Sequence, residues 1–173
     1  FPAIWKMNLA QNWEELRLGV ALFDVPAQNM VYADVEGNIG YQTPGRIPIR
    51  RSGNGRFPVP GWTDDYEWTG YIPFEELPVV FNPAKGYIVT ANNAVVGSDY
   101  PYLITMDWDY GFRAARIVEL IETAPGPIDI AYIQKMQGDN KDLIAMELVP
   151  VLLQVPLEEE RLTAARNLLA DWD

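Results

Sequence analysis

The sequence predicts an α+β fold, in which strands and a long loop come first and helices follow. Three observations support this prediction. A hairpin pattern lies at residues 29–41, prolines and glycines interrupt residues 42–85, and apolar residues recur at helical spacing after Tyr100. We therefore expect a strand and loop portion at residues 1–111 and a helical portion at residues 112–173, which together form one domain or one large part of a domain.

The first two elements are a helix and a hairpin. A helix is expected over residues 12–23, where Asn12 can cap the first turn and Pro26 lies beyond the end. Its apolar positions recur near helical spacing, at Trp13, Leu16, Val20 and Phe23. The turn signal Glu36-Gly37-Asn38 then predicts a β-hairpin, with Gly37 or Asn38 supplying the positive φ of the turn.

Residues 42–85 are too rich in proline and glycine for long regular elements. We expect an ordered excursion held together by its aromatic side chains: Phe57, Trp62, Tyr66, Trp68, Tyr71 and Phe74. Gly86 then opens an apolar and β-branched run at residues 87–90, which predicts a buried strand. That strand would deliver Asn92 and Asn93 at its end.

The remaining residues predict four helices. Apolar residues form a stripe at i, i+3, i+4 and i+7 that stops before Pro125: Ala114, Ile117, Val118 and Ile121. Asp129 can cap a short helix that ends at Gly138, and Asp139 or Asn140 can cap the next one, with a kink or break at Pro150. A last helix should begin near Pro156 and carry Leu162, Ala165, Leu168, Leu169 and Trp172.

Composition excludes several kinds of chemistry. The chain has 173 residues and a net charge of −11, so it lacks the basic surplus that binding to a phosphate backbone requires. It contains no histidine and no cysteine, which excludes Ser-His-Asp and Cys-His catalysis, imidazole or thiolate metal sites and disulfides within these residues. Chemistry here must use carboxylates, amides, hydroxyls, lysine or arginine.

Two motifs resemble a known family. They are the run YADVEGNIGY at residues 32–41 and the pattern Asn-Pro-x-x-Gly-Tyr-Ile-x-x-x-Asn-Asn at residues 82–93. Together they resemble the penicillin acylase, or penicillin amidase, family of N-terminal nucleophile hydrolases. The family's nucleophile is a serine freed as a new N-terminus by self-cleavage, whereas this chain begins with Phe1. We therefore expect an interior fragment of the β-chain region that lacks the nucleophile.

The resemblance implies two catalytic residues. Asn92 matches the family's oxyanion asparagine, and Arg113, in the segment Trp108 to Ile117, matches its active-site arginine. Negative charge develops on the carbonyl oxygen when an amide is attacked, and a fixed side-chain amide can donate to it. A guanidinium fork can hold carbonyl or amide oxygens in place. For Arg116 we expect only an ion pair with Glu119 or Glu122.

The resemblance also implies calcium in the intact parent, at a structural site held mostly by other segments. One backbone carbonyl ligand would fall near Gly55. An aspartate ligand of the family lies between the positions matching Asn93 and Trp108, where the shorter spacing of this sequence assigns it to neither Asp99 nor Asp107. We do not expect a complete calcium site within these residues, because calcium takes six or more oxygens. No substrate-binding residue is predicted.

The expected function is that of a part of a linear amide hydrolase, acting on the acyl side chains of β-lactams or on acyl-homoserine lactones. The expected partners are the α chain, the N-terminal part of the β chain and a small-molecule amide, with possible self-association of the fragment. No nucleic-acid or membrane partner is expected. The resemblance implies a periplasmic or extracellular parent, and the chain alone is expected to be inactive.

Two other functions are open from the residues alone. The chain would instead be a binding or structural module if its loop tryptophans grip a ligand such as a carbohydrate. A glycosidase needs two carboxyl groups set across a cleft, and carboxylates are present at Asp34, Glu36, Asp64, Asp65 and Glu67. No spacing selects a pair among them, so solvated turn positions are the favoured interpretation.

Overall fold

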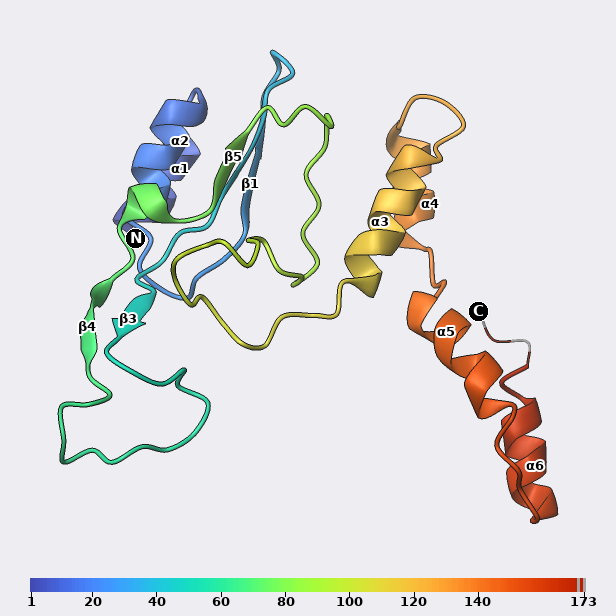
Figure 1. Cartoon of the computed structure of the whole chain (residues 1–173). Coiled ribbons are helices and arrows are strands. Elements are labelled where there is room, and N and C mark those ends of the chain that lie inside the picture. The colour runs from blue at the N-terminus through green and yellow to red at the C-terminus, as the bar shows by residue number, and fades with distance from the viewer. Residues whose placement is uncertain (171, 173) are drawn as a thin grey trace. The chain divides into compact units, whose positions relative to one another are not determined.

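The structure is a computed structural model that describes residues 1–170 and residue 172. It mixes α-helices with short antiparallel strands, which confirms the predicted α+β class (Figure 1). The backbone divides into two compact units, Phe1–Thr90 with Ala94–Trp108, and Ala91–Asn93 with the residues from Asp109 onward. The predicted domain limits stay a prediction, and their last residues, Asp171 and Asp173, lie outside the described residues.

The first unit contains two small sheets. A three-stranded antiparallel sheet has the order β1-β2-β5, and a two-stranded sheet pairs β3 with β4. The bounds are β1 Met30–Ala33, β2 Ile39–Gln42, β3 Pro48–Arg50, β4 Trp68–Tyr71 and β5 Val79–Phe81, with a 3₁₀ turn at Phe74–Glu76. These elements are as short as the proline and glycine content predicts.

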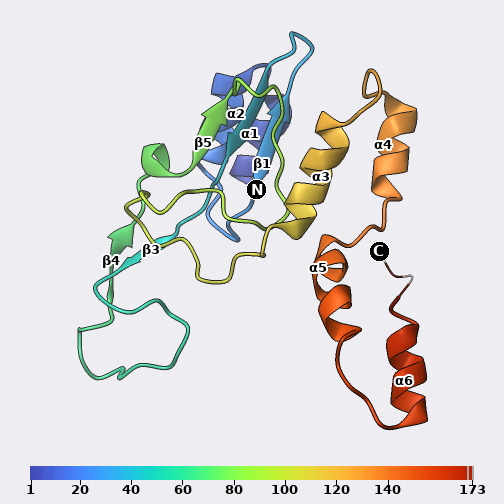
Figure 2. The same cartoon turned by 45° about the vertical axis from the view of Figure 1, so that its right-hand side comes forward.

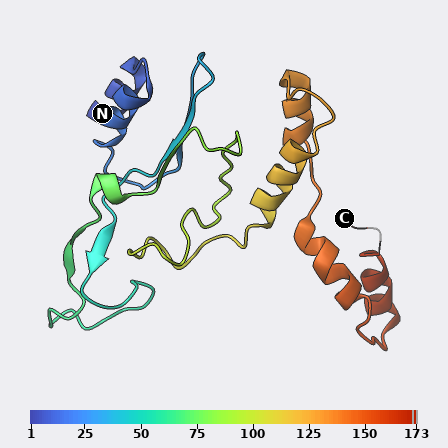
Figure 3. The ribbon, with the colours of Figure 1, turned by 45° about the horizontal axis from the view of Figure 1, so that its top comes forward.

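Two helices, α1 Pro2–Leu9 and α2 Trp13–Val20, pack against each other in the first unit (Figure 3). The predicted cap of α2 is confirmed, because Oδ1 of Asn12 accepts a hydrogen bond of 2.9 Å from the Glu15 N–H. Helix α1 was not predicted. It has no polar side-chain cap, and its apolar residues are mostly exposed, so it shows no one-sided stripe.

The predicted hairpin is confirmed as β1 and β2, and Gly37 supplies the positive φ, at 88°. Asp34 organises the turn, since its Oδ1 accepts hydrogen bonds of 2.9 Å from the backbone N–H groups of Glu36 and Asn38. The hydrogen bond from the Asn38 side chain is the largest cause that lowers the pKa of Asp34. Asp34 is therefore a structural turn residue.

Aromatic stacking ties α2 to the three-stranded sheet. The rings of Trp13 and Phe81 stack with their centroids 5.3 Å apart, and the ring of Tyr32 lies 5.5 Å from that of Trp13 in a tilted arrangement. Gly40 lies directly beneath Trp13, where a Cβ atom would stand 2.6 Å from the indole ring. The sheet thus requires glycine at this position for the helix to approach.

The expectation that six aromatic side chains hold the excursion together is wrong for Phe57 and Trp62. These side chains are 75% and 85% exposed, respectively. Polar contacts close the base of the loop instead: Nη1 of Arg51 donates to the Asp64 carbonyl at 2.7 Å, and Ser52 Oγ donates to the carbonyl of Asp65 at 2.9 Å. Because backbone carbonyls are satisfied in this way, the loop is closed without burying its outer aromatics.

The predicted buried strand at residues 87–90 is also wrong. Its side chains are half-buried, but no ladder forms there, and the nearest bridge joins Asn93 to Asp109 in parallel. A strand needs a neighbouring strand to bond its backbone, and the described residues supply none for this segment. A β-branched apolar run alone therefore does not decide strand formation.

The described residues of the second unit form four helices (Figure 2): α3 Phe112–Glu122, α4 Ile130–Gln137, α5 Leu143–Leu152 and α6 Glu160–Asn167. The predicted Asp129 cap is confirmed by a hydrogen bond of 2.8 Å from the Tyr132 N–H. In the described residues, no helix is long and apolar enough to cross a membrane.

Three details of these helices correct the prediction. Asp142 caps α5, not Asp139 or Asn140, because Asp139 is engaged by Arg116. Helix α5 does not break at Pro150, which lies in the last turn and costs the helix only one backbone hydrogen bond. Helix α6 begins at Glu160 and not near Pro156, and it ends at Asn167.

Candidate functional site

The structure brings together the two side chains that the sequence singled out, Asn92 and Arg113. Asn92 follows the irregular segment at residues 87–90, and Arg113 lies in the first turn of α3. Nη2 of Arg113 donates a hydrogen bond of 2.8 Å to Oδ1 of Asn92 and one of 2.9 Å to the carbonyl of Ala91. The guanidinium thus binds both the side chain of Asn92 and the backbone beside it.

The backbone of Asn92 is left-handed, with a φ of 63°. Asparagine tolerates this conformation better than most residues with a side chain. Its neighbours hold it: Oδ1 of Asn93 accepts a hydrogen bond of 3.0 Å from the Ala91 N–H, and the Asp109 N–H donates to the Asn92 carbonyl at 2.8 Å. Hydrogen bonds therefore hold both the backbone of Asn92 and the end of its side chain in place.

The contact with Arg113 determines which way the Asn92 amide faces. A guanidinium can only donate, so the amide oxygen must face it and the Nδ2 group must face away. Among the residues described, no acceptor contacts Asn92 Nδ2, and the side chain is exposed. This leaves two N–H donors, held in a defined direction, for a group outside the network.

Asp109 completes the network and was not among the predicted site residues. Its Oδ2 accepts from Nε and Nη2 of Arg113 at 3.3 and 3.1 Å, and its Oδ1 accepts from the Gly111 N–H at 3.0 Å. The Gly111 hydrogen bond, followed by the Arg113 side chain, lowers the pKa of Asp109. The sequence signal for this pair was a carboxylate four residues before an arginine.

Arg116 lies outside this network, as expected. It pairs with Glu119 at 2.9 Å, which confirms one of the two predicted partners, and it forms a two-pronged hydrogen bond with Asp139 at 2.8 and 2.6 Å. The Asp139 side chain is the largest cause that raises the pKa of Arg116, and the same contact lowers the pKa of Asp139. Arg116 therefore joins α3 to Asp139, the second residue after the end of α4.

The structure places an arginine beside Gly55, where the resemblance implies a calcium ligand. The described chain has no group of three or more carboxylates that could hold a metal. The guanidinium of Arg50 packs so closely on Gly55 that a Cβ atom there would lie 2.9 Å from Nη2, and Asp107 pairs with Arg56 at 3.3 Å. A cation beside the expected ligand disfavours a second one. The calcium role of Gly55 stays a prediction, and no step is derived through calcium.

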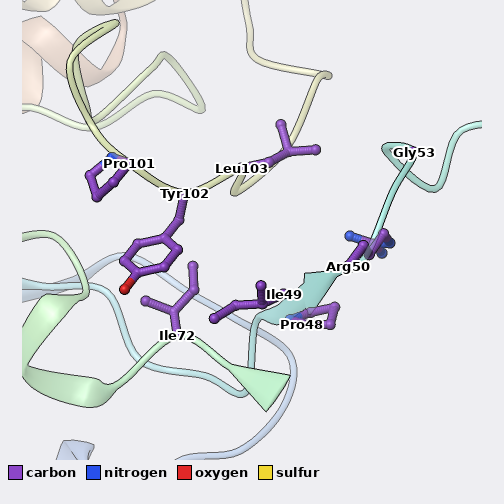
Figure 4. Close-up of a pocket in the computed structure, with 8 residues that line it drawn as sticks. All are labelled: Pro48, Ile49, Arg50, Gly53, Ile72, Pro101, Tyr102 and Leu103. Atoms are coloured by element: carbon purple, nitrogen blue, oxygen red, sulfur yellow. The ribbon is translucent and has the colours of Figure 1, made fainter. Parts of the chain in front are cut away.

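A separate small pocket of about 160 Å³ lies in the first unit (Figure 4). Its lining includes Ile49, Ile72 and Leu103, but polar atoms form more of its exposed wall than apolar ones do. The hydroxyl of Tyr102 is already engaged by Glu76, and the pocket contains neither Asn92 nor Arg113. It therefore adds nothing to the predicted site.

The sequence matches the penicillin amidase family over residues 1–173. The chain belongs to this family. Penicillin acylase 2 proenzyme from Pseudomonas sp. (strain SE83) is 43% identical over 118 residues, which is 68% of this chain and 15% of that protein. An acyl-homoserine lactone acylase, QuiP from Pseudomonas syringae pv. tomato, is 34% identical over 145 residues, which is 84% of this chain and 17% of QuiP.

A solved structure agrees with the family assignment. Thermostable penicillin G acylase from Alcaligenes faecalis matches 99% of this chain and 31% of its own with a TM-score of 0.72 and 28% identity. The mixed helices and small sheets described above therefore belong to the N-terminal nucleophile hydrolase fold. The chain spans only a small share of each of these relatives, 15% and 17% of the two curated proteins.

Proposed function

We propose that this penicillin amidase chain acts as part of a complete acylase that hydrolyses linear amides, and that Asn92 stabilises the oxyanion. One observation carries the proposal: Arg113 binds the Asn92 amide oxygen at 2.8 Å and so turns the Nδ2 donors away from the network. Family membership supports the reaction class, since the relatives include a penicillin acylase and an acyl-homoserine lactone acylase.

Asn92 suits this role because its amide is neutral, fixed and able to donate. When a nucleophile attacks an amide carbonyl, the oxygen becomes an anion and gains most from donors that are already in place. Arg113 fixes the amide tip, and the left-handed backbone fixes its base. The Nδ2 donor would then need no reorganisation during the reaction, because the native fold already orients it.

Arg113 supports the site through Asn92. Its guanidinium donates to the Ala91 carbonyl and to Oδ1 of Asn92, so removing it would free both groups to rotate. The positive charge also lies close to where the oxyanion would form, which favours that charge electrostatically. Arg113 thus acts as a positioning residue with a secondary electrostatic effect.

In the proposed reaction, the nucleophile comes from another segment of the acylase. An N-terminal serine attacks the acyl carbonyl, its own α-amine takes the hydroxyl proton, and that proton passes to the leaving amine. Water then hydrolyses the acyl-enzyme. The partners are the remaining acylase segments and a small amide, such as a β-lactam side chain or an acyl-homoserine lactone. A periplasmic or extracellular location belongs to the same proposal.

The test is amine release from phenylacetyl, phenoxyacetyl and long-chain acyl amides. The complete acylase should turn over at least one of these substrates, and Asn92→Ala should slow it by about 10²- to 10³-fold. The 173-residue chain alone should release no amine. Turnover by the chain alone that disappears with Asn92→Ala would mean that a nucleophile lies within these residues, and it would overturn the proposed mechanism.

A matched control separates the role of Asn92 from a general charge or folding effect. Asn54 also accepts a backbone hydrogen bond through its side-chain oxygen, from the Arg56 N–H at 3.1 Å, but it lies in the exposed loop of the first unit. Asn54→Ala should leave the rate within about twofold, because an exposed substitution of this kind rarely has a large effect.

A further inference from the structure

We infer that Asp109 is a positioning residue that holds Arg113 against Asn92 and so fixes the direction of the oxyanion donor. This inference rests on the proposed function of Asn92. Asp109 contacts both partners: its carboxylate accepts from the Arg113 guanidinium, and its backbone N–H donates to the Asn92 carbonyl at 2.8 Å.

Arg113 needs such an anchor because of where it lies. It is in the first turn of α3, where the positive end of the helix dipole repels a cation. Its side chain is 60% exposed, so without a fixed partner it would sample many rotamers in solvent. A carboxylate at the same end of the helix offsets the dipole and holds the guanidinium fork.

The hydrogen-bond count shows why Asp109 matters for the contact with Asn92. Nη2 of Arg113 carries two hydrogens but serves three acceptors: the Ala91 carbonyl, Oδ1 of Asn92 and Oδ2 of Asp109. Nε gives Asp109 a second hydrogen bond, at 3.3 Å. The fork is therefore aligned by Asp109, and this alignment points Nη2 at the Asn92 amide.

Asp109 is itself held in place. Its Oδ1 accepts from the Gly111 N–H, and Gly111 adopts a φ of 89° that favours glycine. The Asp109 side chain is only 29% exposed, compared with 60% for Arg113. The chain of contacts thus runs from a rigid turn, through a carboxylate and a guanidinium, to an amide.

The experiment measures kcat and KM of the complete acylase for a phenylacetyl amide. Asp109→Asn keeps an oxygen for the Gly111 N–H but presents donors to Arg113, so it loosens the guanidinium and leaves the backbone contacts. We expect kcat to fall about 10- to 100-fold with KM little changed, since small displacements of catalytic groups have effects of this size. Glu119→Gln, which removes a carboxylate from Arg116 on the same helix, should leave kcat unchanged within about twofold.

A second variant series decides whether Asp109 acts through Asn92. In an Asn92→Ala background, Asp109→Asn should have no further effect, because the donor it positions is gone. An equal loss in both backgrounds would mean that Asp109 only maintains the fold, and it would overturn the inference. Asp109→Ser, which keeps a short acceptor for Gly111, repeats the comparison if Asp109→Asn fails to fold.

The outcomes also separate this inference from the proposed function. If Asn92→Ala is slow but Asp109→Asn is as fast as the unaltered acylase, Asp109 has no positioning role and only this inference fails. If Asn92→Ala itself keeps the full rate, the proposed function fails, and with it the reason for Asp109 to act.

Discussion

Nη2 of Arg113 lies 2.8 Å from Oδ1 of Asn92, although the two residues belong to different segments of the chain. The contact joins the first turn of α3 to the residues just before the isolated bridge between Asn93 and Asp109. Because arginine only donates, this single contact sets the orientation of the Asn92 amide. The hydrogen bond from Arg113 therefore leaves the Nδ2 group of Asn92 available as a donor.

Arg113→Lys tests whether the shape of the guanidinium matters beyond its charge. Lysine keeps the charge but cannot reach the Ala91 carbonyl, Asn92 and Asp109 with a planar fork. We expect the kcat of the complete acylase to fall by about tenfold, the effect of losing about one hydrogen bond to a charged group. Steady-state kinetics measure this, and an unchanged kcat would show that charge alone suffices.

Gly40→Ala should destabilise the first unit by about 1–3 kcal/mol, the usual cost of overpacking. A Cβ atom at Gly40 would lie 2.6 Å from the ring of Trp13, so the indole must move off Phe81. Gly61→Ala is the matched control, since a Cβ there meets nothing within 4 Å. Urea unfolding measures both, and equal midpoints for the two variants would contradict the packing described.

Asp34 should make the hairpin sensitive to acid. The pKa of Asp34 is lowered in the folded state, chiefly by the Asn38 side chain. The Asp34 carboxylate therefore stabilises the folded state fully above the unfolded pKa of about 3.9, and this stabilisation is lost as the pH falls through the lowered folded pKa. Asp34→Asn should reduce this loss of stability below about pH 4. Urea unfolding between about pH 2 and 5 measures it, and identical pH slopes for the two proteins would contradict the prediction.

Tyr32 gives the same hairpin a second titration, at alkaline pH. Burial, followed by the hydrogen bond to Asp34, raises the pKa of Tyr32 to about 12. The stability from neutral Tyr32 is therefore full below the unfolded pKa of about 10 and is lost as the pH rises toward about 12. Tyr32→Phe should remove this alkaline loss, and ultraviolet titration of the tyrosine phenolate checks the raised pKa directly.

Arg116 and Asp139 should stabilise the second unit as a coupled pair. Their side chains are joined by two hydrogen bonds, of 2.8 and 2.6 Å, so Arg116→Gln leaves Asp139 without its main partner. Arg116→Gln and Asp139→Asn should each lower the Tm. The variant that carries both substitutions should lower the Tm by less than the sum of the two single shifts. Thermal melts of the four proteins measure the coupling, and additive shifts would contradict it.

The sequence predicted the elements whose ends carry their own signals. Asn12 and Asp129 cap α2 and α4 through their side chains, and Gly37 provides the positive φ of the hairpin. These signals are local, because each depends on residues within one turn of the cap or bend. Two helices and one hairpin follow from such residues, and a third helix, α3, follows from its apolar stripe.

The prediction failed where partners far along the chain decide the structure. Residues 87–90 have the composition of a strand, but strand formation depends on a neighbour that composition does not reveal. Asp139 has the features of a helix cap, yet Arg116 engages it and Asp142 caps α5 instead. An acidic residue before a helix can serve either role, and only the three-dimensional arrangement selects between them.

The candidate site shows the same division. The family resemblance identified Asn92 and Arg113, but no sequence spacing indicated that they touch or which way the amide faces. Asp109 was missed because its significance comes from two contacts at once, one through its carboxylate and one through its backbone N–H. Resemblance thus found the residue types, and the structure supplied their connections.

The most direct test of the central claim is the acylation rate of the complete acylase carrying Asn92→Asp. Aspartate keeps the oxygen that accepts from Arg113 and tolerates the left-handed backbone, but it replaces the Nδ2 donors with a charge that repels an oxyanion. Single-turnover kinetics with a phenylacetyl amide should show acylation slowed by about 10²- to 10³-fold or more, with substrate binding little changed. Acylation at the unaltered rate would contradict the assignment of Asn92 as the oxyanion donor.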